Sequence, residues 1–325
     1  MKDVIKTGFR SLAVPAAVAL MAAPVAAQDL SIATGGTGGT YFPYGGGLAE
    51  VISNHVEDAS ASAEVTGASV ENVALIARGD SDIAIALADT VYGAYTGTGA
   101  FDGRQVGELR ALASIYPNAV QIVTLADSGI SSLDDLRGKR VSVGAPGSGT
   151  EVSAQTLLEA NGITYDDFDE QRLNFNETAD ALRDGDIDAG FWSVGPPTSS
   201  ILNLATTRDI AMVPMASDQI AAAVEVQPVF APYTLRAGLY EGMDMAVPTI
   251  STPNVLIVHE DMDEELAYNI TKAMYENVDE LIAIHPAAND TTLEFSTAAT
   301  PIPFHPGALR YLEEVGADVQ DRQRP

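Results

Sequence analysis

The sequence predicts an α/β fold of two lobes joined by two hinge crossings, with a ligand cleft between the lobes. Two glycine-rich loops, at 35–40 and 144–149, each follow an apolar segment of strand length and precede a helical pattern. Two other apolar segments, at 121–125 and 254–258, are each followed by acidic residues and a helix. This repeat indicates that the chain passes from one lobe to the other and later returns.

The repeat places one crossing near Pro117 and the other near Pro253. We therefore assign residues 28–117 and 254–325 to lobe I, and residues 118–253 to lobe II. Proline breaks strands, so we expect the chain to be interrupted at Pro117. Two such lobes can close around a bound solute by hinge bending.

Lobe I is expected to alternate short buried strands with helices. We predict strands at 30–33, 62–66, 82–87 and 109–116, and helices around 48–52, at 67–79 and at 91–95. Ser69 is a plausible cap for the second helix and Gly79 its stop. The tail, 281–315, is helical in patches and is expected to pack back on lobe I.

Lobe II follows the same alternation. We predict strands at 119–125, 141–143, 171–175, 187–193 and 210–215, and helices at 133–136, 152–160, 178–183 and 196–204. Pro196 and Pro197 are expected in the first turn of the last helix. The segment 226–249, rich in proline and glycine, is predicted to form irregular loops, and Trp192 is predicted to lie in the core rather than over a ligand.

The first glycine loop predicts an anion-binding site. Its glycines can adopt positive φ and let a ligand approach the bare backbone. The helix that follows begins with N–H groups that have no intrahelical partner and carry partial positive charge. The ligand-binding residues that we predict here are Gly36, Thr37, Gly38, Gly39, Thr40, Tyr41 and Tyr44.

The second glycine loop repeats this arrangement about a hundred residues later. Ser148, Gly149 and Thr150 lie where the next helix begins, and their hydroxyl and N–H groups are candidate donors. A third helix start, after Ser193 and Gly195, is expected on the same rim. A single loop of this kind would indicate only a connecting turn, whereas two facing loops favour a grip on a small anion from both sides.

Asp89 follows the predicted strand at 82–87, at the sheet edge where α/β proteins bind ligands. Its carboxylate is suited to accept a hydrogen bond from a ligand ammonium. It is equally suited to cap the helix at 91–95. Both roles stay open.

The sequence lacks the residues that the relevant enzyme motifs require. The second loop has Thr150 and Glu151 where a P-loop has Lys and Ser or Thr, and the first loop has Tyr41 at the third glycine position of a dinucleotide motif. Ser148 lacks the surroundings of a nucleophile. The four histidines have no metal-ligand spacing, and His305 is predicted to be structural. We expect no catalysis, no cofactor and no metal.

Residues 1–27 combine Lys2, Lys6 and Arg10 with a proline-broken apolar run ending at Ala27. This pattern predicts a secretory signal peptide and a periplasmic protein, without stable membrane insertion. The net charge of −28 argues against nucleic-acid binding, and the absence of cysteine excludes disulfides and thiolate chemistry. The expected partner is a small anionic metabolite, held by local donors rather than by the protein's net charge.

The chain resembles the TAXI family, the extracytoplasmic solute-binding proteins of one class of TRAP transporters. The resemblance covers nearly the whole chain after the signal peptide. It is carried by the segments at 32–41, 111–117, 138–150, 185–191 and 305–311. It implies a type II periplasmic binding fold and delivery of the solute to TRAP membrane permease subunits that use an ion gradient, not ATP.

The resemblance further implies a carboxylate ligand: glutamate, glutamine, a dicarboxylate or a 2-oxo acid. Family pockets use the first loop, its tyrosine and the Ser/Thr loop, which correspond here to 36–41 and 148–150. Leu87 departs from the polar residue of many relatives, which weakens recognition of an amino-acid head group. Two other functions remain: a periplasmic sensing subunit for a signalling partner, and a hydrolase using Ser148, which would require turnover that we do not expect.

Overall fold

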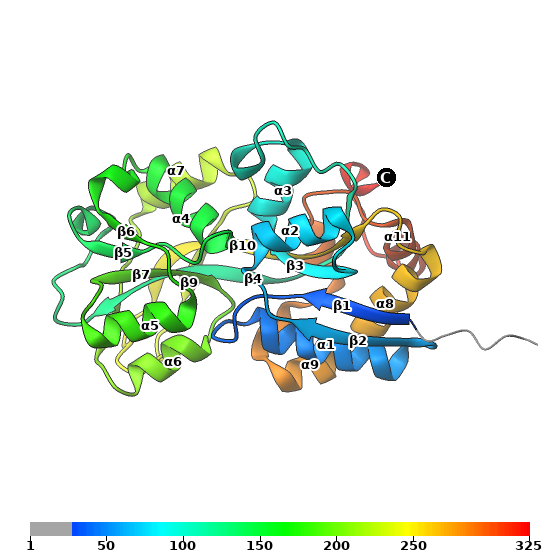
Figure 1. The fold of residues 1–325 in the computed structure, drawn as a ribbon, viewed down its shortest axis with the longest axis horizontal. Coiled ribbons are helices and arrows are strands. Elements are labelled where there is room, and N and C mark those ends of the chain that lie inside the picture. Colours follow the sequence, from blue (N-terminus) through cyan, green and yellow to red (C-terminus); the bar gives the residue numbers. More distant parts are fainter. Residues whose placement is uncertain (1–27) are drawn as a thin grey trace, which may run out of the picture.

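The computed structural model describes residues 28–325, which form two α/β lobes lying side by side (Figure 1). The predicted signal peptide at 1–27 lies outside the described residues. Within 28–325, every helix is too short or too polar to cross a bilayer.

One sheet runs through both lobes in the order β2-β1-β3-β10-β4-β7-β5-β6, with β8 paired to β4 and β9 paired to β10. The strands are β1 (Gln28–Ala33), β2 (Ala59–Glu64), β3 (Ile83–Leu87), β4 (Leu109–Leu125), β5 (Arg140–Ser142), β6 (Asp169–Gln171), β7 (Ala189–Val194), β8 (Ile210–Met212), β9 (Ala231–Leu235) and β10 (Val247–His259). Strand β1 is parallel to β2 and β3, and β5 is parallel to β6 and β7. The antiparallel strands β4 and β10 join the two parallel groups.

Helices pack against the sheet in both lobes (Figure 1). Lobe I contains α1 (Tyr41–His55), α2 (Ser69–Arg78), α3 (Ala88–Thr96), α8 (Glu264–Glu276), α9 (Val278–Ile284), α10 (Leu293–Ala299) and α11 (Pro306–Glu314). Lobe II contains α4 (Gly149–Ala160), α5 (Phe175–Asp184), α6 (Ser199–Ala205) and α7 (Ser217–Val226). Each glycine loop leads from a strand end directly into a helix, as predicted.

Local sequence signals set several helix ends. Gly79 and Gly185 end α2 and α5 with φ of 69° and 78°, a left-handed conformation that glycine adopts without a steric penalty. Asn174 starts α5 by accepting hydrogen bonds from the backbone N–H groups of Asn176 and Glu177. This cap also explains why the strand predicted at 171–175 is wrong beyond Gln171: the chain is already turning into α5.

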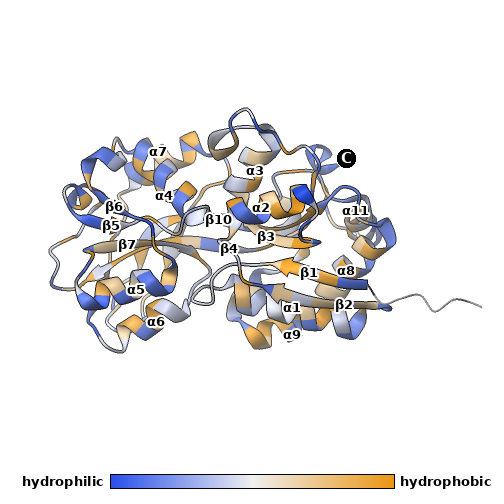
Figure 2. Ribbon diagram, viewed as in Figure 1, coloured by the Kyte–Doolittle hydropathy of each residue, from blue (hydrophilic) through white to orange (hydrophobic). Residues whose placement is uncertain are grey.

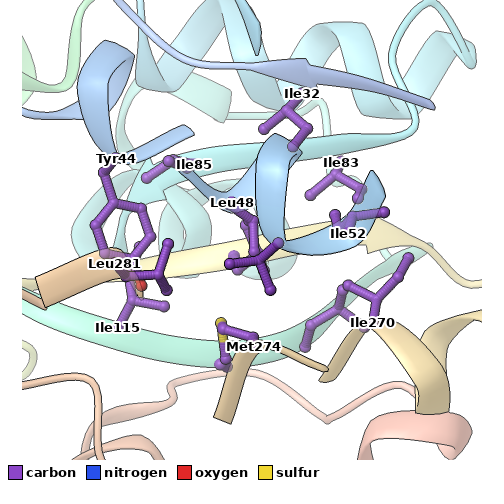
Figure 3. Packing of buried hydrophobic residues seen from close by; sticks show 14 of the residues in the cluster. Ile32, Tyr44, Leu48, Ile52, Ile83, Ile85, Ile115, Ile270, Met274 and Leu281 are labelled. Carbon is purple, nitrogen blue, oxygen red and sulfur yellow. The ribbon is translucent and has the colours of Figure 1, made fainter. Parts of the chain in front are cut away.

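The apolar residues of the strands and of the inward helix faces form the core, while polar residues lie on the outer helix faces (Figure 2). In lobe I, side chains of α1, α8 and α9 interdigitate with those of the sheet (Figure 3). The buried residues labelled there are Ile32, Tyr44, Leu48, Ile52, Ile83, Ile85, Ile115, Ile270, Met274 and Leu281. A separate cluster, including Ile122, Val143, Leu157 and Phe191, fills lobe II.

The predicted break at Pro117 is wrong, because β4 runs unbroken from lobe I into lobe II. Pro117 lies directly opposite Pro253 of β10 in the antiparallel pairing. Neither proline has an N–H, so two prolines can face each other only where no ladder hydrogen bond is formed. The ladder is irregular between Pro253 and Val255 but continues beyond it. Both crossings are therefore strands.

Two further expectations in lobe II are wrong. The segment 226–249 contains β9 and the start of β10, and Pro232 is accommodated because β9 pairs only with β10 and so lies at an edge. Helix α6 begins at Ser199, after the extended N-cap residue Thr198, so Pro196 and Pro197 precede the helix instead of forming its first turn.

Other expectations are confirmed. The C-terminal tail packs on lobe I, where Phe304 forms an isolated bridge with Ala111. His305 is 1% exposed; its Nδ1 accepts from the backbone N–H of Gly307, and its Nε2 lies 3.3 Å from the Glu260 carbonyl oxygen, so it caps α11. Trp192 is fully buried and donates to Ser200 Oγ at 3.1 Å.

Candidate ligand-binding site

A cavity of about 260 Å³ lies where the two glycine loops face each other across the lobes. The predicted site residues that line it are Gly36, Gly39, Thr40, Tyr41, Ser148, Gly149, Thr150 and Ser193. Sequence reasoning missed most of the remaining wall, namely Gly35, Val65, Thr66, Gly67, Ala68, Ser69, Asn118, Ala145, Asn174, Phe175 and Val194. Leu87, noted only for its departure from the TAXI pattern, also lines the cavity.

The other predicted site residues do not reach the cavity wall. Thr37 is exposed and its Oγ1 accepts from Asn176 Nδ2 at 3.3 Å. Tyr44 is buried in the lobe I core, hydrogen-bonded to Thr291. Gly38, Gly195 and Asp89 lie at contacts between the lobes, described below, so a ligand-binding role for these five residues rests on the sequence alone.

The second glycine loop supplies hydroxyl groups that donate no hydrogen bond within the protein. Ser148 Oγ accepts from the backbone N–H of Glu151 at 3.2 Å, and Thr150 Oγ1 accepts from the backbone N–H of Ser193 at 3.4 Å. Because each oxygen already accepts, its O–H is oriented to donate elsewhere. Ser193 Oγ is buried and has no hydrogen-bond partner at all. A buried hydroxyl without a partner is costly, and Ser193 is a residue of the cavity wall, so Ser193 is a candidate donor to a bound ligand.

The first glycine loop differs, because the hydroxyls with which it lines the cavity already donate hydrogen bonds to other protein groups. Thr40 Oγ1 donates to the Gly195 carbonyl at 2.7 Å, and the Tyr41 hydroxyl donates to Asn254 Oδ1 at 2.5 Å. Burial raises the pKa of Tyr41, so this phenol stays protonated and keeps donating. The expectation that Thr40, Tyr41 and Tyr44 act as ligand donors is therefore not supported by their hydrogen bonding.

Two helix starts near the cavity are occupied by carbonyl oxygens from the opposite lobe. The Gly38 carbonyl accepts from Ser199 Oγ at 3.2 Å and from the Ser200 N–H at 3.4 Å. The Gly147 carbonyl accepts from the N–H groups of Val70 and Glu71 at 3.1 and 3.4 Å. The third anion-binding helix start, predicted after Gly195, is thus used by the protein itself to hold the lobes together.

The glycines of the loops allow the two lobes to approach each other closely. None of Gly35, Gly36, Gly38 and Gly39 has a positive φ, contrary to expectation. A Cβ placed on Gly149 would lie 2.5 Å from Ser69 Oγ and 2.7 Å from Leu87 Cδ1, and one on Gly195 would lie 2.9 Å from the Tyr116 ring. These distances are too short for real side-chain contacts, so only glycine allows the observed arrangement.

A chain of buried hydrogen bonds links the cavity to the crossing strands. Asn254 of β10 donates to the Tyr116 carbonyl at 2.9 Å and to Asn118 Oδ1 at 2.8 Å, besides accepting from Tyr41. Asn118 of β4 in turn donates to the Ser193 carbonyl at 2.9 Å. Both asparagines are buried, and each directly follows the proline of its crossing strand in the sequence. A polar residue inside an otherwise apolar strand is the sequence signal that could have identified them.

Asp89 is almost completely buried in the first turn of α3, and Leu87 is the N-cap residue. Its Oδ1 accepts from the Thr90 N–H at 2.7 Å and its Oδ2 accepts from Ser153 Oγ of lobe II at 2.6 Å. Burial raises the pKa of Asp89 to about 6, opposing the hydrogen bonds from Ser153 and Thr90 that lower it. Asp89 therefore joins the two lobes, and neither the N-cap role nor a contact with the cavity is observed.

This raised pKa predicts a pH-dependent contribution to stability. Between about pH 4, the ordinary pKa of an aspartate, and pH 6, the folded protein holds a proton at Asp89 that the unfolded chain releases. The free energy of unfolding therefore falls as pH rises through this interval. Relative to the wild type, Asp89→Asn should gain roughly 1–3 kcal/mol between pH 4 and pH 7, measured by urea unfolding.

The exposed-site variant Asp318→Asn is the matched control, and its difference from the wild type should be nearly the same at both pH values. If the free energy of unfolding of Asp89→Asn also differs from that of the wild type by the same amount at both pH values, the raised pKa of Asp89 is contradicted.

The cavity wall carries no charged side chain among the residues that the structure describes. Its electrostatics therefore come from neutral donors and from the starts of α1 and α4, where the first N–H groups carry partial positive charge. Within 28–325, no group of three or more His, Asp or Glu side chains is arranged to hold a metal ion.

A family model described as the NMT1-like family matches residues 32–316. Among solved structures, a putative L-cystine ABC transporter protein from Listeria monocytogenes is 14% identical with a TM-score of 0.52, covering 81% of this chain and 95% of that chain. PhnD1 from Prochlorococcus marinus, solved with methylphosphonate, is 10% identical with a TM-score of 0.54, covering 81% and 91%. A protein from Bordetella bronchiseptica is 19% identical with a TM-score of 0.53, covering 90% of each chain. The two-lobe fold is thus shared with these proteins.

Proposed function

Because the chain belongs to the NMT1-like family, we propose that it is an extracytoplasmic solute-binding protein that captures a small carboxylate between its lobes. The observation that carries this proposal is a group of hydroxyls at the second glycine loop that donate no hydrogen bond within the protein: those of Ser148 and Thr150, which line the cavity, and that of the neighbouring lining residue Ser193. The backbone N–H of Thr150, at the start of α4, is also unused by the protein. Donors without acceptors, in a site without cations, are suited to a small anion rather than to a large polyanion.

The proposal includes delivery to the membrane subunits of a TRAP transporter. It is supported by the TAXI-like segments, two of which, at 32–41 and 138–150, contain the glycine loops that line the cavity. The solved protein with a named transport role, from Listeria monocytogenes, belongs to an ABC transporter, so the two transporter classes need a direct test. Uptake reconstituted with the permease subunits should depend on an ion gradient and continue without ATP.

We further propose that the lobes comprise 28–117 with 254–325, and 118–253, and that they hinge where Pro117 faces Pro253. Separate hydrophobic clusters in the two lobes support this division. A hinge at this point would change the contacts of Asn118 and Asn254, which connect it to the cavity wall.

Binding is tested by calorimetry and thermal shift against amino acids, dicarboxylates, 2-oxo acids and unsubstituted acids. A true ligand at a hundredfold excess over its Kd should raise the free energy of unfolding by about 2.7 kcal/mol. Thr150→Val removes one hydroxyl donor and should weaken binding about tenfold while the fold is retained. Thr96→Val, at an exposed residue outside the lining, is the control. Absence of binding by every anionic class would refute the proposal.

A further inference from the structure

We propose that the ligand is a monocarboxylate with an uncharged, mainly apolar body and no ammonium group. This class follows from which hydrogen-bonding groups of the cavity wall are already bonded within the protein and which remain free. The inference rests on the proposed function and narrows it. It excludes the amino acids and the dicarboxylates that the sequence left open.

An ammonium group has no counter-ion in this cavity. Leu87, at the end of β3, lines the wall, whereas Asp89, two residues on, does not. The three hydrogen bonds to the Asp89 carboxylate come from Thr90 N–H, Thr90 Oγ1 and Ser153 Oγ, at 2.7, 3.3 and 2.6 Å. Protein donors thus occupy three of the roughly four acceptor positions of this carboxylate. An unpaired ammonium buried in the cavity would lose its hydration without replacement.

Most of the hydroxyl donors that the protein leaves free lie on one side, at the start of α4; the exception is Ser69 of lobe I, whose Oγ accepts from the Leu87 N–H at 3.0 Å. Ser148, Thr150 and Ser193 each keep a hydroxyl proton, and Gly149 and Thr150 add the first N–H groups of a 12-residue helix. These five neutral donors are enough for the roughly four acceptor positions of one carboxylate. On the opposite side, the Thr40 and Tyr41 hydroxyls donate to Gly195 and Asn254, so a second carboxylate would find fewer donors there, namely the Ser69 hydroxyl and the N–H groups at the start of α1.

The rest of the wall is apolar and holds the body of the ligand. Leu87, Phe175, Ala68 and Val194 present carbon atoms to the cavity. The cavity volume of about 260 Å³ admits a short aliphatic chain. Burying this chain strengthens binding about fourfold per CH₂ group, before the costs of binding are subtracted.

Three acids with the same five-carbon chain test the inference by calorimetry with the full-length mature protein. Pentanoate carries one carboxylate, norvaline adds an ammonium and glutarate adds a second carboxylate. Pentanoate is expected to bind at least tenfold more tightly than either of the others, and the neutral pentanamide should not bind detectably. Norvaline or glutarate binding as tightly as pentanoate would overturn the ligand class and leave carboxylate capture intact. If no member of the three binds while a longer or branched amino acid does, the class is likewise overturned. Failure of every anion would instead refute the proposed function.

A matched pair of variants tests where the carboxylate lies. Ser193 Oγ and Thr252 Oγ1 are both buried without a partner, but only Ser193 lines the cavity. Ser193→Ala and Thr252→Val each remove such a hydroxyl, so neither should lower the melting temperature of the unliganded protein. Only Ser193→Ala should weaken pentanoate binding, by about tenfold. Equal affinities of Ser193→Ala and the wild type would remove Ser193 from the site and overturn the placement.

Discussion

Replacement of Gly149 by Ala should weaken ligand binding about 10- to 100-fold without unfolding either lobe. The added Cβ would lie 2.5 Å from Ser69 Oγ, 2.7 Å from Leu87 Cδ1 and 2.9 Å from Ser69 Cβ. The first two atoms can rotate away, but Ser69 Cβ moves only with the backbone of α2, so this part of lobe I must shift before the lobes can meet. Overpacking of this kind costs about 1–3 kcal/mol, and each 1.4 kcal/mol is a tenfold change in affinity. Gly149 is the first residue of α4 and its φ is not positive, so alanine retains the backbone N–H and suits the helix.

Small-angle scattering gives a second readout that needs no ligand, since Gly149→Ala should enlarge the radius of gyration. Gly46→Ala is the control, because a Cβ at Gly46 meets nothing within 4 Å and the residue lies in α1, outside the cavity. That variant should bind normally and be stabilised by about 0.5–1 kcal/mol. Normal affinity of Gly149→Ala would show that the lobes tolerate separation at this contact.

Asn254→Ala should lower the free energy of unfolding by about 3 kcal/mol. The side chain is fully buried and has three partners: the Tyr41 hydroxyl, the Tyr116 carbonyl and Asn118 Oδ1. Its removal leaves three buried polar groups short of a hydrogen bond, each at a cost of about 1–3 kcal/mol before relaxation. Urea unfolding measures the change.

Tyr41→Phe is the graded comparison, because it removes only one of these three bonds. It should cost about 1 kcal/mol, clearly less than Asn254→Ala. Equal losses in the two variants, or a loss below 1 kcal/mol for Asn254→Ala, would mean that the network relaxes around the missing amide.

Much of the fold could be predicted because its signals are local. The apolar runs that became β1, β3 and β7, the loops that became starts of α1 and α4, and the stops at Gly79 and Gly185 all depend on residues close together in the chain. The same local reasoning located eight residues of the cavity wall.

The errors concern partners that are distant in the sequence. Pro117 is tolerated within β4 because Pro253 lies opposite, a pairing that the local sequence does not specify. The sequence predicts the Tyr41 hydroxyl as a ligand donor, yet this hydroxyl donates to Asn254, 213 residues away. The sequence suits Asp89 to a ligand contact or a helix cap, whereas its carboxylate accepts from Ser153 of the other lobe. Which donors remain free is decided only when the whole chain is folded.

The carbonyl groups of Gly38 and Gly147 accept hydrogen bonds from helix starts of the opposite lobe, so these bonds favour the conformer in which the lobes meet. In the hinged solute-binding protein that we propose, they would set the fraction of molecules in that conformer, and this fraction would multiply the association constant of every solute alike. Changes at Ser199 or Val70 would then rescale all affinities by one factor and preserve their ranking.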